Sequence, residues 1–395
     1  MGGAEVLARA QAIELARLGH HVRIVSFSLG RLAGSVGDAV ELVELRRPLR
    51  RPEAPRAFFE AGTGIERALR VVLGDVERVI AHHPPASELA ARVGLAARTV
   101  FYCHEPPRSL HRTAVSPRLE AFSRSPEARE SLAAAGYLRA LRLDARRELV
   151  PFGIATFRRE ERRAVQALHA VWANSEFTRS LVESVYGRAD ADVVPPFVAA
   201  AVSDADEITQ RRRGEGEPLR LLLRSRLQPM KNVDAVLRAV KLGLDRGLRL
   251  ELDVVGEGTS RSALERFSRA LGIADQVRFH GFLPAAESER VSRNAHVFVL
   301  LPFDEPFGMV FVEAALAGLS VLGPDSGGAP EILRHGGFLA RPEAPEAIAG
   351  AIAEIEGATS AELAERSARL KRHCVEHYTR QAFARRAGAL LAKRT

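Results

Sequence analysis

Residues 296–318 read HVFVLLPFDEPFGMVFVEAALAG, and this stretch predicts a strand, a turn and a helix in succession. The apolar run 296–301 is typical of a buried strand. A break of Pro, Phe and Gly at 306–308 separates this run from 310–317, which has the composition of a helix ending at Gly318. The N-terminus of such a helix has free backbone N–H groups, which suit the oxygens of phosphates or sugar hydroxyls.

Two carboxylates, Glu305 and Glu313, belong to this unit, with seven residues between them. We expect Glu305 at the mouth of the pocket beside the turn and Glu313 on the inner face of the helix. Carboxylates accept hydrogen bonds from the vicinal hydroxyls of a sugar or a ribose. The alternative is a loop charge and an ordinary solvent-facing helix residue. Since Glu313 lies in an apolar run, where an unpaired charge is costly, we favour a binding role.

Strands and helices alternate throughout the second half of the chain. This alternation predicts a parallel sheet covered by helices on both faces. The expected strands are 219–224, 248–255, 277–280, 296–301 and 319–323, and the expected helices are 233–243, 260–271, 288–293, 310–317, one beginning at Pro330, 342–357 and 360–392.

Two cations, Arg226 and Lys231, follow the first of these strands. Ligands of open α/β sheets bind at the carboxyl ends of strands, and an Arg fork with a Lys point charge can neutralise a diphosphate. Both could instead be surface cations of an arginine-rich chain, but Lys231 is one of only four lysines. Gly256 lies in a glycine turn after the next strand, which is a weak signal by itself. Gly327-Gly328 forms a second such turn and could offer N–H groups to phosphate.

Together these motifs resemble the GT4 family of retaining glycosyltransferases (glycosyl transferases group 1, GT-B fold), from Gly2 to about Phe383. The resemblance implies an α/β protein of two facing Rossmann-like domains with an inter-domain cleft. It also implies that the first glutamate and the following backbone hold the donor sugar, while the second glutamate holds the ribose. The implied site residues of this half are Arg226, Lys231 and Glu305 as the catalytic set and Gly256, Phe307, Gly308, Met309, Val310 and Glu313 as donor-binding residues.

The first half has a histidine loop, Tyr102 to Arg108, directly after an expected strand at 99–102. A histidine at a strand's carboxyl end could donate a hydrogen bond to a sugar, although a lone histidine is more often structural. The loop resembles that of mannosyltransferase-like GT4 members, which implies a catalytic role for His104. Glu105 and Arg108 are then expected on the acceptor side.

The chain opens with Gly2-Gly3 before a helical pattern, and the resemblance makes Gly3 donor-binding. The family has a strand before this turn, so we expect a chain that lacks its first strand. Either the true start lies upstream of Met1, which we favour, or the domain is compromised. We expect an acceptor-side Rossmann-like domain at 1–200, a linker at 201–217, a nucleotide-sugar-binding Rossmann-like domain at 218–370 and a C-terminal helix at 371–395 that packs back on the first domain.

The charge and amino-acid composition of the chain limit the kinds of molecule that it is expected to bind. The formal charge is +8, but the arginines are scattered among acids with few aromatics, which argues against nucleic acid. A weak attraction to anionic lipid headgroups is compatible with this charge. No signal peptide or membrane-length apolar run occurs, and Cys103 and Cys374 suggest no disulfide framework. These features predict a cytoplasmic protein, with peripheral contact at the inner face of a membrane as a further expectation.

The expected activity is metal-independent transfer of a hexose, with mannose as the first guess, from a nucleotide sugar to a glycan or a lipid-linked acceptor. No cofactor is expected beyond the nucleotide sugar as co-substrate. The D-x-D triplets at 190–192 and 204–206 are interpreted as loop charges rather than metal ligands. A glycoside hydrolase using Glu305 and Glu313, a sugar-nucleotide epimerase and a non-catalytic surface-binding protein stay open as alternatives.

Overall fold

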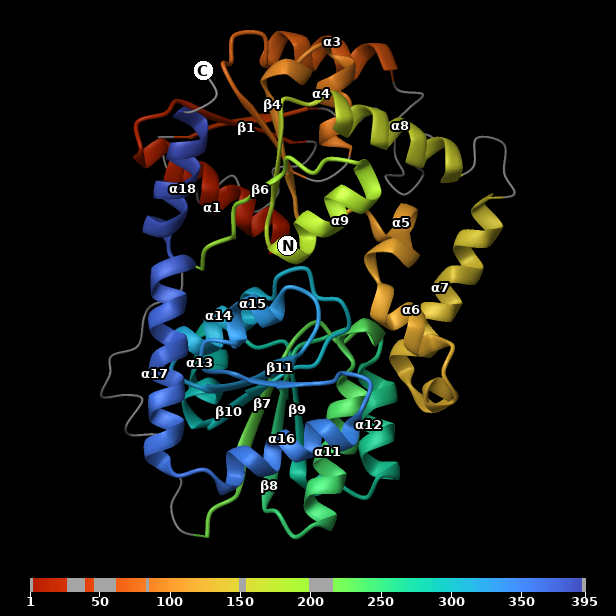
Figure 1. Cartoon of the computed structure of the whole chain (residues 1–395), viewed down its shortest axis with the longest axis vertical. Coiled ribbons are helices and arrows are strands. Elements are labelled where there is room, and N and C mark those ends of the chain that lie inside the picture. The colour runs from red at the N-terminus through yellow and green to blue at the C-terminus, as the bar shows by residue number, and fades with distance from the viewer. Residues whose placement is uncertain are drawn as a thin grey trace. The chain divides into compact units, whose positions relative to one another are not determined.

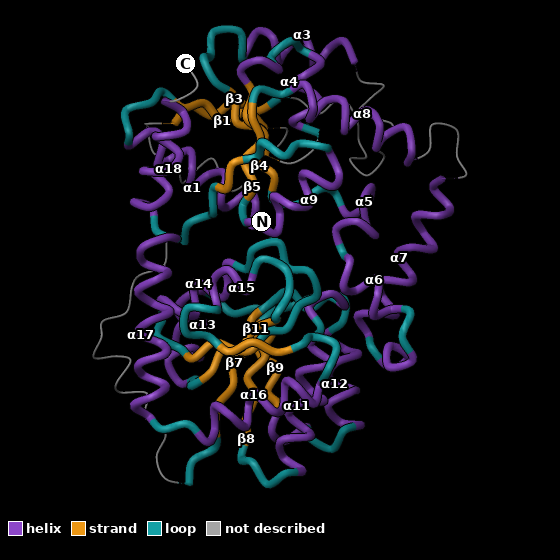
Figure 2. The backbone as a smooth tube through the Cα atoms, viewed as in Figure 1, coloured by secondary structure: helices purple, strands orange, loops and turns teal. Residues whose placement is uncertain are grey.

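The chain folds into two compact units in the computed structural model (Figure 1). The structure describes residues 3–26, 40–45, 62–82, 85–148, 154–198 and 216–392. The first unit comprises Met1–His111, Pro151–Ala199 and Arg380–Thr395, and the second comprises Arg112–Val150 and Ala200–Thr379. Each unit is built around parallel strands flanked by helices, shown by colour in Figure 2.

The second unit contains a six-stranded parallel sheet in the order β12-β11-β10-β7-β8-β9. The chain adds β8 and β9 on one side of β7, then returns to add β10, β11 and β12 on the other. Parallel strands covered on both faces are largely apolar, as in β11, where all five residues are buried. The strands are β7 (Leu219–Arg224), β8 (Leu250–Val255), β9 (Val277–Gly281), β10 (Val297–Val299), β11 (Ser320–Pro324) and β12 (Phe338–Ala340).

Helices follow the strands of this unit, as the alternation predicts. They are η4 (Pro229–Lys231), α11 (Val233–Asp245), α12 (Arg261–Ala270), η5 (Ala274–Gln276), α13 (Ala285–Asn294), α14 (Met309–Leu316), α15 (Ala329–Leu333), α16 (Pro345–Gly357) and α17 (Ser360–His377). Each expected strand and helix of this half is present, with ends shifted by a few residues, while β12 was not predicted. The expected helix 360–392 is divided in two, because the chain breaks after His377.

The first unit contains two sheets, one pairing β1 with β2 and one in the order β3-β4-β5-β6, with all pairs parallel. Its strands are β1 (Val22–Ser26), β2 (Val40–Glu44), β3 (Val79–His82), β4 (Thr99–Cys103), β5 (Ala170–Ala173) and β6 (Asp192–Val193). Its helices are α1 (Gly3–Arg17), α3 (Gly62–Val72), α4 (Ala86–Arg92), η2 (Ala96–Arg98), α8 (Ile154–Ala167), α9 (Glu176–Tyr186) and α18 (Arg380–Ala392).

The grouping of residues differs from the expected domain boundaries in one long segment. Residues 112–150 were expected in the first domain, but they belong to the second unit. They contain α6 (Pro117–Ser123), η3 (Pro126–Glu130) and α7 (Leu132–Glu148). The division falls inside α5 (Arg108–Val115), where His111 has non-helical φ and ψ of −124° and 32°. The physical reason is burial: Leu119, Ala133 and Tyr137 form a core cluster with Phe303 of the second unit.

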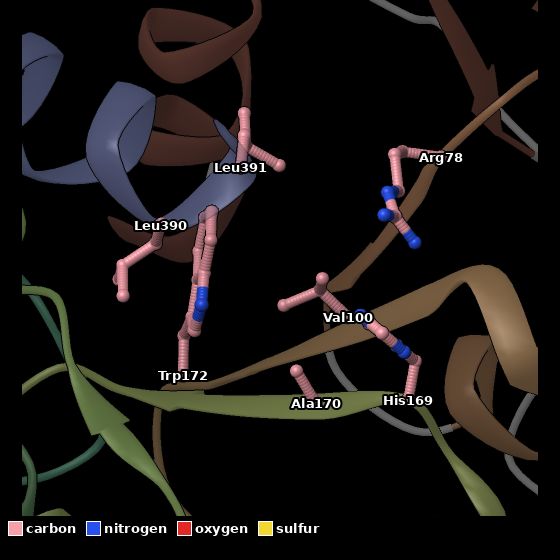
Figure 3. A pocket seen from close by; sticks show the side chains of 7 residues that line it. All are labelled: Arg78, Val100, His169, Ala170, Trp172, Leu390 and Leu391. Atoms are coloured by element: carbon pink, nitrogen blue, oxygen red, sulfur yellow. The ribbon is translucent and has the colours of Figure 1, made fainter. Parts of the chain in front are cut away.

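The C-terminal helix α18 contributes to the core of the first unit. Phe383 and Ala387 are buried in one cluster with Leu7, Tyr102 and Trp172. A small pocket remains beside α18, lined by Ala170 and Trp172 among others (Figure 3). It lies toward the amino ends of β4 and β5, whereas parallel sheets bind ligands at the carboxyl ends, so we interpret it as a packing gap.

Candidate functional site

The order of the strands in the six-stranded sheet points to the carboxyl ends of β7 and β10 as the candidate ligand site. The chain reverses its direction of strand addition between β7 and β10, which are adjacent in the sheet. In open α/β sheets, ligands bind outside the carboxyl ends of the strands at such a switch point. The loop 225–232 follows β7 and the loop 300–308 follows β10, and these two loops contain Arg226, Lys231 and Glu305.

Lys231 and Glu305 meet at this switch point. The Nζ of Lys231 lies 2.6 Å from Oε2 of Glu305, and both side chains are partly exposed. Asn232 holds the two loops together: it is 1% exposed, and its Nδ2 donates to the carbonyl oxygens of Leu301 (3.0 Å) and Pro342 (2.7 Å). Its φ of +56° is a left-handed conformation that Asn tolerates better than most residues. The structure thus brings two of the predicted site residues, Lys231 and Glu305, into contact.

Glu313 lies on α14 and pairs with Arg224, the last residue of β7, at 2.6 Å. Burial raises the pKa of the Glu313 carboxyl, and the charge of Arg224 opposes this rise. The cost of burying this carboxylate is therefore offset in part by Arg224, a cation that the sequence analysis did not single out. Arg224 and Glu313 together form a polar, partly exposed pair at the carboxyl end of the sheet.

Arg226 projects from the same loop and is exposed. Within the ranges that the structure describes, the side chain of Arg226 makes no hydrogen bond or ion pair, so this guanidinium is available to an anion. Gly256 allows the loop to approach β8 closely: its φ is +134°, and a Cβ there would lie 1.9 Å from the Ser225 carbonyl oxygen. The turn at Gly256 thus packs directly against the loop 225–232, which carries Arg226 and Lys231.

The turn before α14 supplies backbone donors next to Glu305. Gly308 is the N-cap with φ of +93°, and Phe307 is buried against Tyr378 with ring centroids 5.3 Å apart. The N–H groups of Met309 and Val310, in the first turn of α14, have no acceptor within the helix. The Gly327-Gly328 turn has a different use from the one expected: the Gly328 N–H donates to the Glu305 carbonyl oxygen at 2.7 Å rather than being free for phosphate.

In the first unit, His104 follows β4 and has two neighbours from adjacent strand ends. Its Nε2 lies 3.1 Å from Nδ1 of His82, which ends β3, and its carbonyl oxygen accepts from Asn174 Nδ2 at 2.8 Å. One imidazole of the pair must donate to the other, so His82 influences the tautomer of His104.

The remaining predicted residues of the first unit are Glu105, Arg108 and Gly3. Glu105 and Arg108 form a two-point pair, with Nε–Oε2 at 2.7 Å and Nη2–Oε1 at 2.5 Å. They are therefore mutually neutralised rather than separate charges. Gly3 is the first residue of α1.

No cluster of three or more His, Cys, Asp or Glu side chains suited to a metal ion occurs in the described ranges. Asp190 of the first D-x-D triplet instead pairs with Arg188 at 2.6 Å. The second triplet, 204–206, lies outside the described residues. None of the helices that the structure describes combines the length and the apolarity that a membrane span requires.

Two family models together match almost the whole chain. The model described as Glycosyl transferases group 1 matches residues 204–372, and the one described as Glycosyltransferase Family 4 matches residues 1–201, just over half of the 395 residues. The chain belongs to glycosyltransferase family 4. The resemblance inferred from the motifs is confirmed.

Relatives of this family 4 chain carry names that describe glycosyl transfer. The D-inositol 3-phosphate glycosyltransferase of Streptomyces griseus subsp. griseus is 38% identical over 159 residues, which are 37% of this chain and 33% of that protein. The GDP-mannose-dependent alpha-(1-6)-phosphatidylinositol monomannoside mannosyltransferase of Mycobacterium tuberculosis is 31% identical over 196 residues, 46% of this chain and 51% of that protein. The chain thus spans between a third and about half of the length of these relatives.

The fold has a match over the full chain. The crystal structure of Anabaena Alr3699/HepE in complex with UDP and glucose has a TM-score of 0.68 at 18% identity, covering 99% of this chain and 96% of that chain. At this identity the likeness shows the fold. The predicted α/β class with two Rossmann-like domains, the GT-B fold, is confirmed.

Proposed function

We propose that this family 4 chain transfers a hexose, with retention of the anomeric configuration, from a nucleotide sugar to a glycan or a lipid-linked acceptor. The observation that carries the proposal is the Lys231–Glu305 pair at the β7–β10 switch point. A cation and a carboxylate side by side can bind a diphosphate and the hydroxyls of the sugar attached to it. Arg226, exposed on the same loop, adds a second cation for the diphosphate.

The proposed roles divide the donor between two carboxylates. Glu305 and the N–H groups of Met309 and Val310 hold the sugar, and Glu313 accepts hydrogen bonds from the ribose hydroxyls. Arg224 keeps Glu313 in the carboxylate form that this role requires. Binding the nucleotide would replace or share the Arg224 contact.

The reaction is proposed to take place without a metal or a protein base. The bond between the sugar C1 and the diphosphate oxygen breaks, and a new bond forms between C1 and the acceptor hydroxyl oxygen. The departing phosphate oxygen takes the proton of that hydroxyl. Arg226 and Lys231 stabilise the negative charge that develops on the leaving diphosphate. His104 donates a hydrogen bond to the sugar.

The names of the sequence relatives support the choice of substrates. A GDP-mannose-dependent enzyme that acts on a phosphatidylinositol monomannoside favours a mannose-type donor and a lipid-linked acceptor for this chain as well. A D-inositol 3-phosphate glycosyltransferase favours an acceptor with an inositol ring. The proposed setting is the cytoplasm, with peripheral contact at the inner face of a membrane when the acceptor is a lipid.

The hydrolase alternative fits the site less well. A hydrolase needs one protonated and one ionised carboxyl facing the same glycosidic bond. Here Glu305 pairs with Lys231 and Glu313 pairs with Arg224, so each carboxylate has its own cation. This arrangement suits two hydroxyl-binding carboxylates better than an acid and a nucleophile.

A thermal-shift panel of UDP-, GDP- and ADP-sugars tests the proposal. We expect one nucleotide class to raise the melting temperature, followed by acceptor-dependent release of its nucleoside diphosphate. No stabilisation of the folded protein by any of them would refute the proposal. Nucleotide-sugar conversion without an acceptor would favour the epimerase, and cleavage of an aryl glycoside without nucleotide would favour the hydrolase.

A further inference from the structure

The helices α6 and α7, which precede most of the second unit in the sequence, pack on both loops of the proposed donor site. Leu119 of α6 and Tyr137 of α7 are buried in one cluster with Phe303, two residues before Glu305, and Met230 packs against the same cluster next to Lys231. Phe122 stacks on Phe303 with ring centroids 5.4 Å apart. The helices α6 and α7 therefore contact residues that lie next to Lys231 and close to Glu305 in the sequence.

Asp304, next to Glu305, caps α6 from outside the helix. Its two carboxylate oxygens accept the N–H groups of Leu119 (3.0 Å) and Arg118 (3.4 Å). These are the second and third residues of the helix, whose N–H groups a capping side chain normally satisfies. Ser116 occupies the N-cap position but makes no capping hydrogen bond with its side chain. A carboxylate at a helix N-terminus also benefits from the helix dipole.

The conformation of Asp304 is itself unusual. It is 1% exposed and has φ of +47°, a left-handed conformation that is costly for most residues and better tolerated by Asp, Asn and Gly. The two capping hydrogen bonds and the surrounding packing hold the backbone in this state. The direction in which the chain continues into Glu305 depends on it.

Two further contacts join the same segment to the site. Arg118 of α6 binds Glu343 through two hydrogen bonds (2.9 and 2.8 Å) and Asp325 at 2.7 Å, one residue before Ser326 and the Gly327-Gly328 turn. Gly136 of α7 lies directly on Pro229, where a Cβ would come within 2.6 Å of the proline Cβ. Pro229 opens η4, which ends at Lys231.

We propose that α6–α7 (Pro117–Glu148) is the positioning element of the donor site and that Asp304 is its positioning residue for the sugar-binding carboxylate Glu305. Asp304 sets the backbone from which Glu305 reaches Lys231, and Gly136 sets the distance of η4 from α7. The proposal rests on the proposed function, since it assigns the contact of Asp304 to binding of the donor sugar and the contact of Gly136 to binding of the diphosphate.

A series of substitutions at Asp304 separates positioning from folding. D304G removes the capping oxygens without straining the backbone, while D304N keeps one oxygen acceptor and tolerates positive φ. The measurement is the ratio of the Kd of the nucleotide sugar to the Kd of its bare nucleoside diphosphate, by calorimetry. We expect this ratio to rise about tenfold in D304G, to rise less in D304N, and the bare-diphosphate Kd to change less than about twofold.

The possible outcomes separate the positioning role of Asp304 from the proposed function. An unchanged ratio in D304G, or an equal loss of affinity for both ligands, overturns the positioning role, because a loss of fold weakens both equally. Absence of nucleotide binding to the wild-type protein overturns the proposed function itself.

Gly136→Ala provides an independent test on the diphosphate side. The added Cβ must displace Pro229, so we expect affinity for both the nucleotide sugar and the bare diphosphate to fall several-fold. Gly350→Ala in α16 is the matched control, since a Cβ there meets nothing within 4 Å. Equal affinities in the two alanine variants would overturn the role assigned to α7.

Discussion

Glu313 is a carboxylate whose proposed role depends on its charge. Burial raises its pKa, so its charged form is lost at a higher pH than that of an exposed glutamate. We expect Glu313→Ala to weaken nucleotide binding about tenfold at neutral pH, since the ribose hydroxyls lose a charged acceptor. In the wild type, affinity should fall as the pH is lowered through the raised pKa. Calorimetric titration of the nucleoside diphosphate across this pH range measures both effects.

His104→Ala is the contrasting variant for this measurement. Its proposed hydrogen bond goes to the sugar, so turnover should fall while the affinity for the bare nucleotide stays largely unchanged. Nucleotide affinity equal to wild type in Glu313→Ala would contradict the ribose role, whatever the result for His104→Ala.

Glu88 is a titratable residue of the first unit outside the proposed site. It is 7% exposed, and burial raises its pKa from 4.5 to about 7, with a further contribution from Glu161. The folded state therefore favours the neutral carboxyl, and stability falls as pH rises from 4.5 through 7. The loss amounts to about 3 kcal/mol above pH 7. Glu88→Gln removes this titration and should unfold at higher denaturant than wild type at pH 8, with little difference at pH 5.

The fluorescence of Trp172, the only tryptophan of the chain, reports unfolding of the unit that contains Glu88. Glu44→Gln, at an exposed glutamate of the same unit, is the matched control. A denaturant midpoint of Glu88→Gln that parallels wild type at both pH values would show that Glu88 titrates normally.

Individual side chains differed in how far the sequence could predict their contacts. Lys231 and Glu305 could be brought together because both follow strands, and the carboxyl ends of parallel strands share one edge. Arg224 could not, because β7 carries Arg220 on the same face and its pattern does not show which of the two faces α14. Asp304 and His82 were missed for a similar reason: their partners come from distant parts of the sequence.

At the scale of elements, His373 and His377 of α17 form a group of neighbouring rings with His335. His373 stacks on His335 with ring centroids 3.6 Å apart, and His377 lies one turn further along the helix. The pKa of His373 is lowered to about 4, first by burial and then by the positive charges of His335 and His377, while a hydrogen bond to the Glu331 backbone opposes the change. Glu376 approaches His377 at 3.8 Å, and Tyr378 lies beside His373.

The stack predicts loss of stability in acid. The unfolded chain binds a proton at His373 below about pH 6.5, whereas the folded chain does so only near pH 4, so stability falls between these values as the pH is lowered. His373→Phe keeps an aromatic ring without a titrating group and should reduce this slope, as measured by urea unfolding with circular dichroism. His20→Phe, at an exposed histidine, should not. Equal slopes in all three proteins would exclude this source of acid sensitivity.

The elements themselves were predictable where strand and helix alternate with clear breaks. The strand and the helix predicted within residues 296–318 are present as β10 and α14. They could be predicted because a proline and a glycine separate the two apolar runs. The break between α17 and α18 was missed, since residues 377–380 include no glycine or proline. The place of α7 in the second unit was not predicted, because it depends on contacts with Pro229 and Phe303.

At the scale of the whole molecule, the chain passes between the two units four times, at 111/112, 150/151, 199/200 and 379/380. Each unit is therefore completed by a segment distant in sequence: α6–α7 in the second and α18 in the first. Cores assembled from distant segments bury apolar area that neither part buries alone. Stability of the first unit should accordingly depend on the last residues of the chain.

Phe383→Ala tests this dependence. Phe383 is 3% exposed, lies in a cluster with Leu7, Tyr102 and Trp172, and contacts Phe197 with ring centroids 5.1 Å apart. Truncation leaves a cavity in that cluster and should destabilise the first unit by about 3–5 kcal/mol. Denaturant unfolding followed by Trp172 fluorescence measures the loss. Phe282→Ala is the matched control, because Phe282 is 78% exposed in the second unit and should leave the midpoint unchanged. If Phe383→Ala unfolded at the wild-type midpoint, α18 would contribute no stability to the first unit, and its burial there would have to be offset by an equal cost elsewhere.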